Sequence, residues 1–286
     1  MVVIVGCIVV IACVLGGFTI SGGHVGALIH PAEILTIGGA CLGAMIVMAP
    51  VKVLKDMMKG IVQALKGSPY SKTTYEELFK ALYELFRLAR RQGMLALEAH
   101  MADPHESSIF KKYPSLAHNH HATEFIAGLL NPIIEGSVRP ERLPELAEAE
   151  FRALEEEHHA PISVLSKTAD ALPGFGIVAA VLGIVITMGH IDGPVEEIGH
   201  KVGAALVGTF LGILMSYGFV APLVVKLEFL GHAEMSYLRA ASSAIQGFVN
   251  DLPPKVAIEV ARRGLISEVR PGQKELEELL KSVETN

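Results

Sequence analysis

Four long apolar runs dominate the hydrophobic pattern of this chain. They cover residues 2–21, 34–51, 171–191 and 202–225, and none contains a charged side chain. A helix needs about 20 apolar residues to cross a bilayer, and hydrocarbon leaves a spanning backbone only its own hydrogen-bond partners. Each run alone could be a buried core helix. Four such runs in one chain predict a polytopic membrane protein with four transmembrane helices.

The polar stretches also show helical periodicity. Leu78, Leu82, Leu85 and Ala89 recur on one helical face, and charged side chains occupy the other. Gly93 is expected to interrupt this helix, which residues 94–100 continue after a bend, and further helices are expected at residues 124–134, 144–159, 228–248 and 254–263. No alternation of period two is long enough for a sheet. We therefore expect an all-α fold in which membrane helices are joined to a helical cytoplasmic domain.

Basic residues set the expected orientation. Residues 52–170 hold 15 of the 24 Lys and Arg residues, and the tail after residue 225 holds 8 more. Positively charged segments stay in the cytoplasm, so both termini are expected there. No basic residue precedes the first run, which argues against a cleaved signal peptide. The expected parts are transmembrane helices 1 and 2 (1–51), a cytoplasmic helical domain (52–170), transmembrane helices 3 and 4 (171–226) and cytoplasmic C-terminal helices (227–286).

Composition argues against several other functions. The net charge of −6, without a continuous basic stripe, gives no footprint for nucleic acid. The cysteines form no CxxC pair, and no P-loop, GxGxxG or GxSxG pattern has a fitting context, so neither an enzyme activity nor a cofactor is indicated. His118, His120 and His121 could form a metal site or an exposed polar loop. The loop is favoured, because no cysteine or HExxH spacing supports a metal.

The third and fourth runs contain no Asp, Glu, Lys or Arg at depth. Ion pathways usually carry an ionisable group there, so these helices either conduct nothing or receive that group from a partner. The polar side chains available at depth are those of Thr187, Thr209, Ser216 and Tyr217. For Thr209 the alternative is a hydrogen bond from its hydroxyl to its own helix backbone.

Prolines and glycines mark places where the membrane helices depart from regular packing. Pro173 and Pro222 lie at the cytoplasmic ends of the last two runs and suggest a pair of hinges, although Pro173 could simply start its helix. Glycines at four-residue spacing favour close helix packing and oligomerisation. They occur at Gly22/Gly26, Gly39/Gly43 and Gly208/Gly212.

Motifs along nearly the whole chain point to a known family. They are GGF-x-I-SGG-x-x-GAL-x-x-PAE at 16–33, RQGMLALE at 91–98, LPGFGIVAAVLGIV at 172–185 and VGTFLGIL-x-SYGF-x-APL at 207–223. With the four spans, these motifs resemble the A subunit of the bacterial flagellar motor stator, the MotA family. The resemblance implies an inner-membrane homo-oligomer, a pentamer, around two B subunits. Each B subunit would bring a membrane aspartate and a cell-wall anchor, and ion flow would drive the rotor switch protein FliG.

The resemblance also assigns residues. Arg90 and Glu98 match the charged pair that contacts the rotor, eight positions apart and about 12 Å along a continuous helix. Glu150 matches a further acidic position of that contact.

In the ion path, Thr209 matches the threonine near the ion-binding carboxylate. Ala180 stands where sodium-driven relatives tend to carry threonine, which favours protons. Pro173 and Pro222 match the prolines that couple ion flow to conformational change.

Two other functions remain as alternatives. An energising subunit of outer-membrane transport (the ExbB/TolQ group) would share the architecture, but it normally lacks the N-terminal pair of spans seen here. A solute transporter would be expected to show inverted repeats, and no repeat relates the two pairs.

Overall fold

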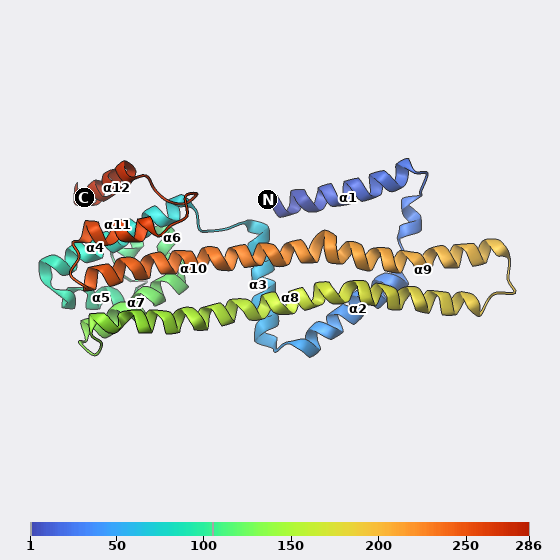
Figure 1. The fold of residues 1–286 in the computed structure, drawn as a ribbon, viewed down its shortest axis with the longest axis horizontal. Helices are drawn as coiled ribbons and strands as arrows, with labels where there is room; N and C mark the ends of the chain where they lie inside the picture. The colour runs from blue at the N-terminus through green and yellow to red at the C-terminus, as the bar shows by residue number, and fades with distance from the viewer. Residues whose placement is uncertain (1, 105, 286) are drawn as a thin grey trace. The chain divides into compact units, whose positions relative to one another are not determined.

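The computed structural model describes residues 2–104 and 106–285, which are helical and contain no β-strand (Figure 1). Four helical segments in these ranges are long and apolar enough to cross a membrane. They are α1 (Val2–Ile20), α2 (Pro31–Met48, preceded by η1, Val25–Leu28), α8 (Leu143–Met188), and α9 (Val195–Met215) with its continuation through η5 (Ser216–Val220) into α10 (Ala221–Val249). The all-α fold and the four predicted spans are confirmed.

The described residues form two compact units. The membrane unit comprises Met1–Gly67 and Glu156–Leu230, and the polar unit comprises Ser68–Glu155 and Gly231–Asn286. Both α8 and α10 continue past the expected boundaries at 170 and 226. Two helices expected at 144–159 and 171–191 are therefore one helix. Pro161 and Pro173 lie inside this helix. A proline removes one backbone hydrogen bond, and the helix continues when its remaining hydrogen bonds are kept.

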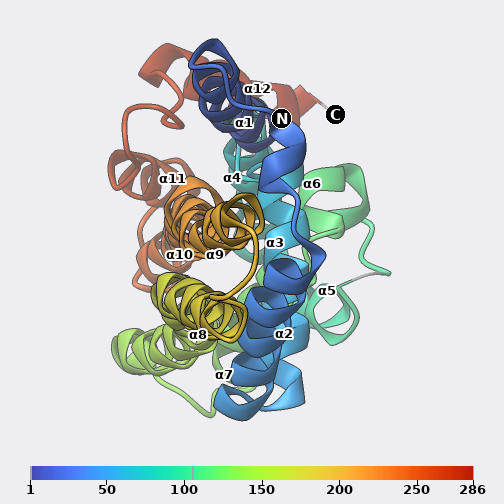
Figure 2. The same cartoon turned by 90° about the vertical axis from the view of Figure 1, so that its right-hand side faces the viewer.

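The membrane unit is built on the antiparallel α8–α9 pair (Figure 2). Helix α2 packs against this pair through a cluster of Ile37, Cys41, Leu172 and Ala179. Helix α3 (Val51–Lys66) follows α2 after a short turn and buries Met57 and Ala64 against Leu165, Val224 and Leu227. Helix α1 has no buried residue within the described chain.

The polar unit surrounds α4 (Lys72–Gln92), whose predicted apolar face is fully buried. Phe86 of α4 stacks on Phe248 of α10 with ring centroids 4.3 Å apart. The short elements are η2 (Met94–Leu97), α5 (Glu98–Ala102), η3 (Phe110–Lys112), α6 (Pro114–Ala117), α7 (His120–Ile134) and η4 (Pro140–Arg142). Of these, η2 and α6 contact α4, as do α11 (Pro254–Arg263) and α12 (Gln273–Thr285). Hydrogen bonds from Arg262 and Arg263 lower the pKa of the Glu259 carboxyl to about 2 and tie together one face of α11.

Candidate functional site

Glycines allow α8 and α9 to approach at backbone contact. A β-carbon on Gly212 would lie 2.6 Å from the Leu172 carbonyl oxygen and 2.9 Å from the Gly176 Cα. A β-carbon on Gly176 would lie 2.8 Å from the Gly208 carbonyl oxygen. The predicted Gly208/Gly212 pair therefore packs on α8, and Gly176 is its partner, which the spacing rule did not identify. Gly39 and Gly43 have open space within this chain.

The structure brings Thr209 and Ala180 to this contact. A β-carbon built on Gly176 would lie 3.3 Å from the Thr209 Cα. A β-carbon built on Gly208 would lie 3.3 Å from the Ala180 backbone nitrogen. Thr209 is half-buried, and its hydroxyl has no hydrogen bond to another described residue. By contrast, the hydroxyl of the fully buried Thr187 donates to the Gly183 carbonyl at 2.8 Å. The self-bonding alternative thus describes Thr187, and the Thr209 hydroxyl is available.

Pro173 lies deep inside α8, so the alternative that it starts its helix is wrong. Because proline has no N–H, the carbonyl four residues earlier, that of Ala169, lacks its helical donor. The Ser216 hydroxyl donates to this carbonyl oxygen at 2.7 Å, and Ser216 is 1% exposed. The sequence indicated Ser216 as a polar residue at depth, but its acceptor follows only from the packing of the two helices.

Pro222 follows the π-helical turn η5 instead of producing a simple kink. In regular α-helical geometry the proline ring would meet the carbonyl of Gly218, and the wider turn relieves that clash. Gly212 packs beside Leu172, so it lies at the level of Pro173. Pro222 follows Gly212 by ten residues, which is about 15 Å along a helix. The two prolines are therefore staggered, and Ser216, the first residue of η5, links the π turn to the carbonyl freed by Pro173.

Ser216→Ala should lower the free energy of unfolding by about 1–2 kcal/mol, because it leaves the buried Ala169 carbonyl without a donor. In a Pro173→Ala background the new N–H at position 173 can satisfy that carbonyl, so the cost should largely disappear. Thermal unfolding of the four proteins of this double-mutant cycle measures the coupling. A coupling energy of zero would contradict the link between Ser216 and Pro173.

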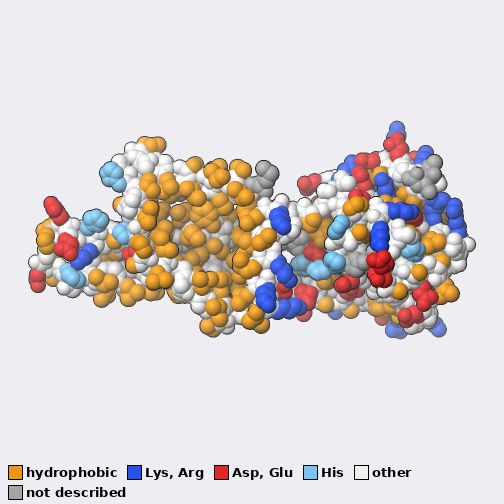
Figure 3. Space-filling model, turned by 180° about the vertical axis from the view of Figure 1, so that it is seen from behind, with side chains coloured by type: hydrophobic (Ala, Val, Ile, Leu, Met, Phe, Trp, Pro, Cys, Tyr) orange, Lys and Arg blue, Asp and Glu red, His pale blue; other side chains and the backbone are white. Residues whose placement is uncertain are grey.

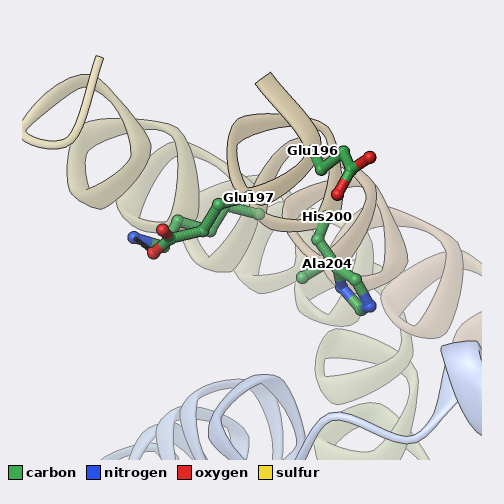
Figure 4. Close-up of a pocket in the computed structure, with 5 residues that line it drawn as sticks. Glu196, Glu197, His200 and Ala204 are labelled. Atoms are coloured by element: carbon green, nitrogen blue, oxygen red, sulfur yellow. Dashed lines mark ion pairs between the residues drawn. The ribbon is translucent and has the colours of Figure 1, made fainter. Parts of the chain in front are cut away.

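The N-terminal end of α9, far from Ser216, carries ionisable side chains. A shallow hollow there is lined by Glu196, Glu197, His200, Lys201 and Ala204 (Figure 4). Lys201 pairs with Glu197 at 2.9 Å, one helical turn apart. Glu196 and Glu197 lie in the first turn of α9, where the helix dipole favours negative charge. These side chains suit a water-exposed helix end.

Arg90 and Glu98 are not on one continuous helix, so that expectation is wrong. Helix α4 ends at Gln92, and Gly93 adopts a φ of +88°, a conformation that favours glycine. The chain then turns through η2 before Glu98 starts α5. Glu98 is exposed and has no hydrogen bond or ion pair with another described residue.

Arg90 already has intramolecular partners. Its guanidinium donates to the Asp251 carbonyl at 2.8 Å and lies 5.9 Å from the centre of the Phe248 ring. These contacts hold the chain where α10 ends. Glu150 is half-buried on α8, 3.8 Å from the position of a β-carbon on Gly128 of α7. Of the three residues assigned to the rotor contact, only Arg90 has a hydrogen-bond partner among the described residues; Glu98 and Glu150 have none, and Glu98 is the more exposed of the two.

The histidines near residue 120 are exposed and lie at a junction between helices. His118 contacts the Pro114 carbonyl at 2.7 Å, and His121 contacts Glu234 at 2.9 Å. Within the described residues, no group of three or more His, Cys, Asp or Glu side chains could hold a metal ion.

Two family models match the chain. The one described as motility protein A N-terminal matches residues 4–93, and the one described as MotA/TolQ/ExbB proton channel family matches residues 117–239. Motility protein A of Salmonella typhimurium is 38% identical, over 99% of this chain and 96% of its own length. The chain belongs to the motility protein A family. Chemotaxis protein LafT of Vibrio parahaemolyticus, another relative, is 36% identical over 96% of both chains.

Solved structures share this fold. The structure of C. jejuni MotAB matches with a TM-score of 0.77 and 23% identity over 95% of this chain and 98% of that one, which supports the fold. The flagellar MotAB stator complex from Bacillus subtilis matches with a TM-score of 0.72 and 26% identity over 90% of this chain and 92% of that one.

Membership of the motility protein A family confirms the function expected from the motifs, an ion-channel subunit of the flagellar stator in the inner membrane. The ExbB/TolQ alternative has less support. The motility protein A N-terminal model covers both α1 and α2, the pair of spans that the alternative lacks.

Proposed function

We propose that this motility protein A homologue conducts protons only together with a B subunit that supplies a membrane carboxylate. The observation that carries the proposal is the available Thr209 hydroxyl at the closest approach of α8 and α9, next to the apolar Ala180. A protonated carboxylate needs one hydrogen-bond partner, which a threonine can provide. A sodium ion, like other hard cations, needs several oxygen ligands, and Ala180 contributes none from its side chain.

The assembly proposed is a pentamer of this chain around two B subunits. The B helix would lie against the exposed apolar face of α8, which includes Ile177, Val181 and Val185. Protonation would remove the carboxylate charge and change its attraction to the α8–α9 surface. The Ser216–Ala169 bond and the π turn before Pro222 lie directly beyond Thr209 and are the proposed route of the resulting shift.

Torque would be delivered by the polar unit. Both α8 and α10 belong in part to each unit, so two of the chain's connections between the units are continuous helices that could carry the movement. Glu98 is the proposed primary contact with FliG because it is exposed and unpartnered among the described residues, and Arg90, which is hydrogen-bonded, and Glu150, which is half-buried, contribute less. Charged contacts of this type give specificity and fast encounter more than affinity. The distribution of Lys and Arg supports a cytoplasmic location of both termini.

Proton flux into liposomes tests the proposal. The purified chain alone should conduct little, and the complex with its native B subunit, freed of any plug, should conduct. Thr209→Val should lower proton flux through the complex by up to about tenfold, the effect of losing one hydrogen bond to a neutral carboxyl group. Thr187→Val is the matched control, because it removes only a bond to its own helix. Equal flux with the Thr209 variant, or a requirement for sodium, would contradict the assignment.

A further inference from the structure

The outer face of α3 is unusual for the surface of a membrane protein. Helix α2 ends at Met48 and α3 begins at Val51, so α3 starts at the boundary where a span leaves the hydrocarbon. Its inner face buries Met57 and Ala64 within the membrane unit. On the outer face, Val51 is 67%, Met58 is 55% and Val62 is 47% exposed. These side chains form an apolar stripe along the whole helix.

Lysines border this stripe. Lys55, Lys59 and Lys66 line the same shallow groove as Val51, Met58 and Val62. Figure 3 shows Lys and Arg side chains gathered at one edge of the apolar surface of the membrane unit, in the region of α3. The helix carries four lysines and one acidic residue, Asp56, so it is strongly basic. Apolar side chains next to lysines at a membrane boundary are the pattern of an interfacial helix.

The positive charge is only partly neutralised within the chain. Lys52 pairs with Glu157 at 3.1 Å, and Lys59 pairs with Asp56 at 3.2 Å. Lys55 and Lys66 have no carboxylate partner among the described residues. Their long stems can lie along the apolar stripe while the ammonium groups reach an anion outside the chain.

We propose that α3 binds anionic phospholipids of the cytoplasmic leaflet. The acyl chains would cover Val51, Met58 and Val62, and headgroup phosphates would lie beside Lys55 and Lys66, which are unpaired within the described residues. A ligand that covers both the stripe and the lysines must have an apolar part and an anionic part. An anionic phospholipid has both, in its acyl chains and its headgroup. The inference rests on the proposed cytoplasmic side of α3. Its function would be to fix the height of α3, and so of the end of α2, at the membrane surface.

Lipid competition tests this surface without a working motor. The full-length chain with its B subunit is reconstituted in vesicles of equal parts phosphatidylglycerol and phosphatidylcholine, and co-purifying lipids are counted by native mass spectrometry. Phosphatidylglycerol should be enriched on the native chain. Lys55→Gln with Lys66→Gln should reduce the enrichment at least about fivefold, since each basic residue near an anionic surface strengthens binding severalfold.

Two control variants make the result specific. Lys55→Arg with Lys66→Arg keeps the charge and should keep the enrichment. Lys111→Gln with Lys274→Gln removes two exposed charges from the polar unit and should change nothing. Equal binding of both lipids by the native chain would overturn the proposal. Unchanged enrichment in the glutamine variant would overturn it too, and loss of the oligomer in that variant would indicate that a second copy of the chain covers α3. Proton flux is measured separately, so failure here leaves the proposed function standing.

Discussion

Gly212→Ala should force α8 and α9 apart and abolish motility. The added methyl would lie 2.6 Å from the Leu172 carbonyl oxygen and 2.9 Å from the Gly176 Cα, and both are backbone atoms. A flexible side chain could move away, whereas a helix backbone moves only as a whole. The expected loss is about 2 kcal/mol or more of unfolding free energy, the upper part of the range for overpacked cores. Thermal unfolding in detergent and swimming in soft agar measure the two effects.

Glycines with free space provide matched controls for this substitution. Gly174 lies two residues from Gly176 on α8, and Gly203 lies on α9, and neither has an atom within 4 Å of a built β-carbon. Alanine at either position should leave stability unchanged or slightly higher, because alanine is the better helix former by about 1 kcal/mol. If Gly212→Ala unfolds at the same temperature as Gly203→Ala, the close α8–α9 contact is wrong.

Glu98→Lys should abolish torque while the protein still inserts and assembles. Glu98 is exposed and forms no hydrogen bond or ion pair with another described residue, so its reversal changes a surface charge and little else. The rotation speed of tethered cells measures torque, and the melting temperature reports stability. Glu124→Lys makes the same change at an exposed position of α7 and should leave both unchanged. Normal rotation of the Glu98 variant would remove this residue from the rotor contact.

Arg90→Glu should have a second effect in addition to lost torque. It removes the hydrogen bond to the Asp251 carbonyl and the contact with Phe248, so the polar unit should lose about 1–2 kcal/mol of stability. A lower melting temperature for the Arg90 variant but not for the Glu98 variant is the expected pattern. Reversing both charges in one variant would mix the two effects.

The four spans, the all-α fold and the functional class could be predicted because they depend on local patterns. A span needs only an uninterrupted apolar run, and the buried face of α4 follows from apolar residues at helical spacing. The glycine spacing also marked Gly208 and Gly212 correctly as close-packing positions. Helix ends were harder to predict from the sequence: the two helices expected at 144–159 and 171–191 are the single helix α8. Proline weakens a helix locally, but whether the helix ends there depends on what satisfies the freed carbonyl.

The sequence by itself therefore determined which segments enter the membrane and which family the motifs resemble. Only the tertiary structure decided that the Ser216 hydroxyl satisfies Ala169, which is 47 positions away, and that Arg90 holds Asp251, which is 161 positions away. It also decided that the Thr187 hydroxyl bonds its own helix and that of Thr209 does not. The physical reason is that a hydrogen bond depends on the positions of both partners, and residue spacing fixes such positions only within one helix.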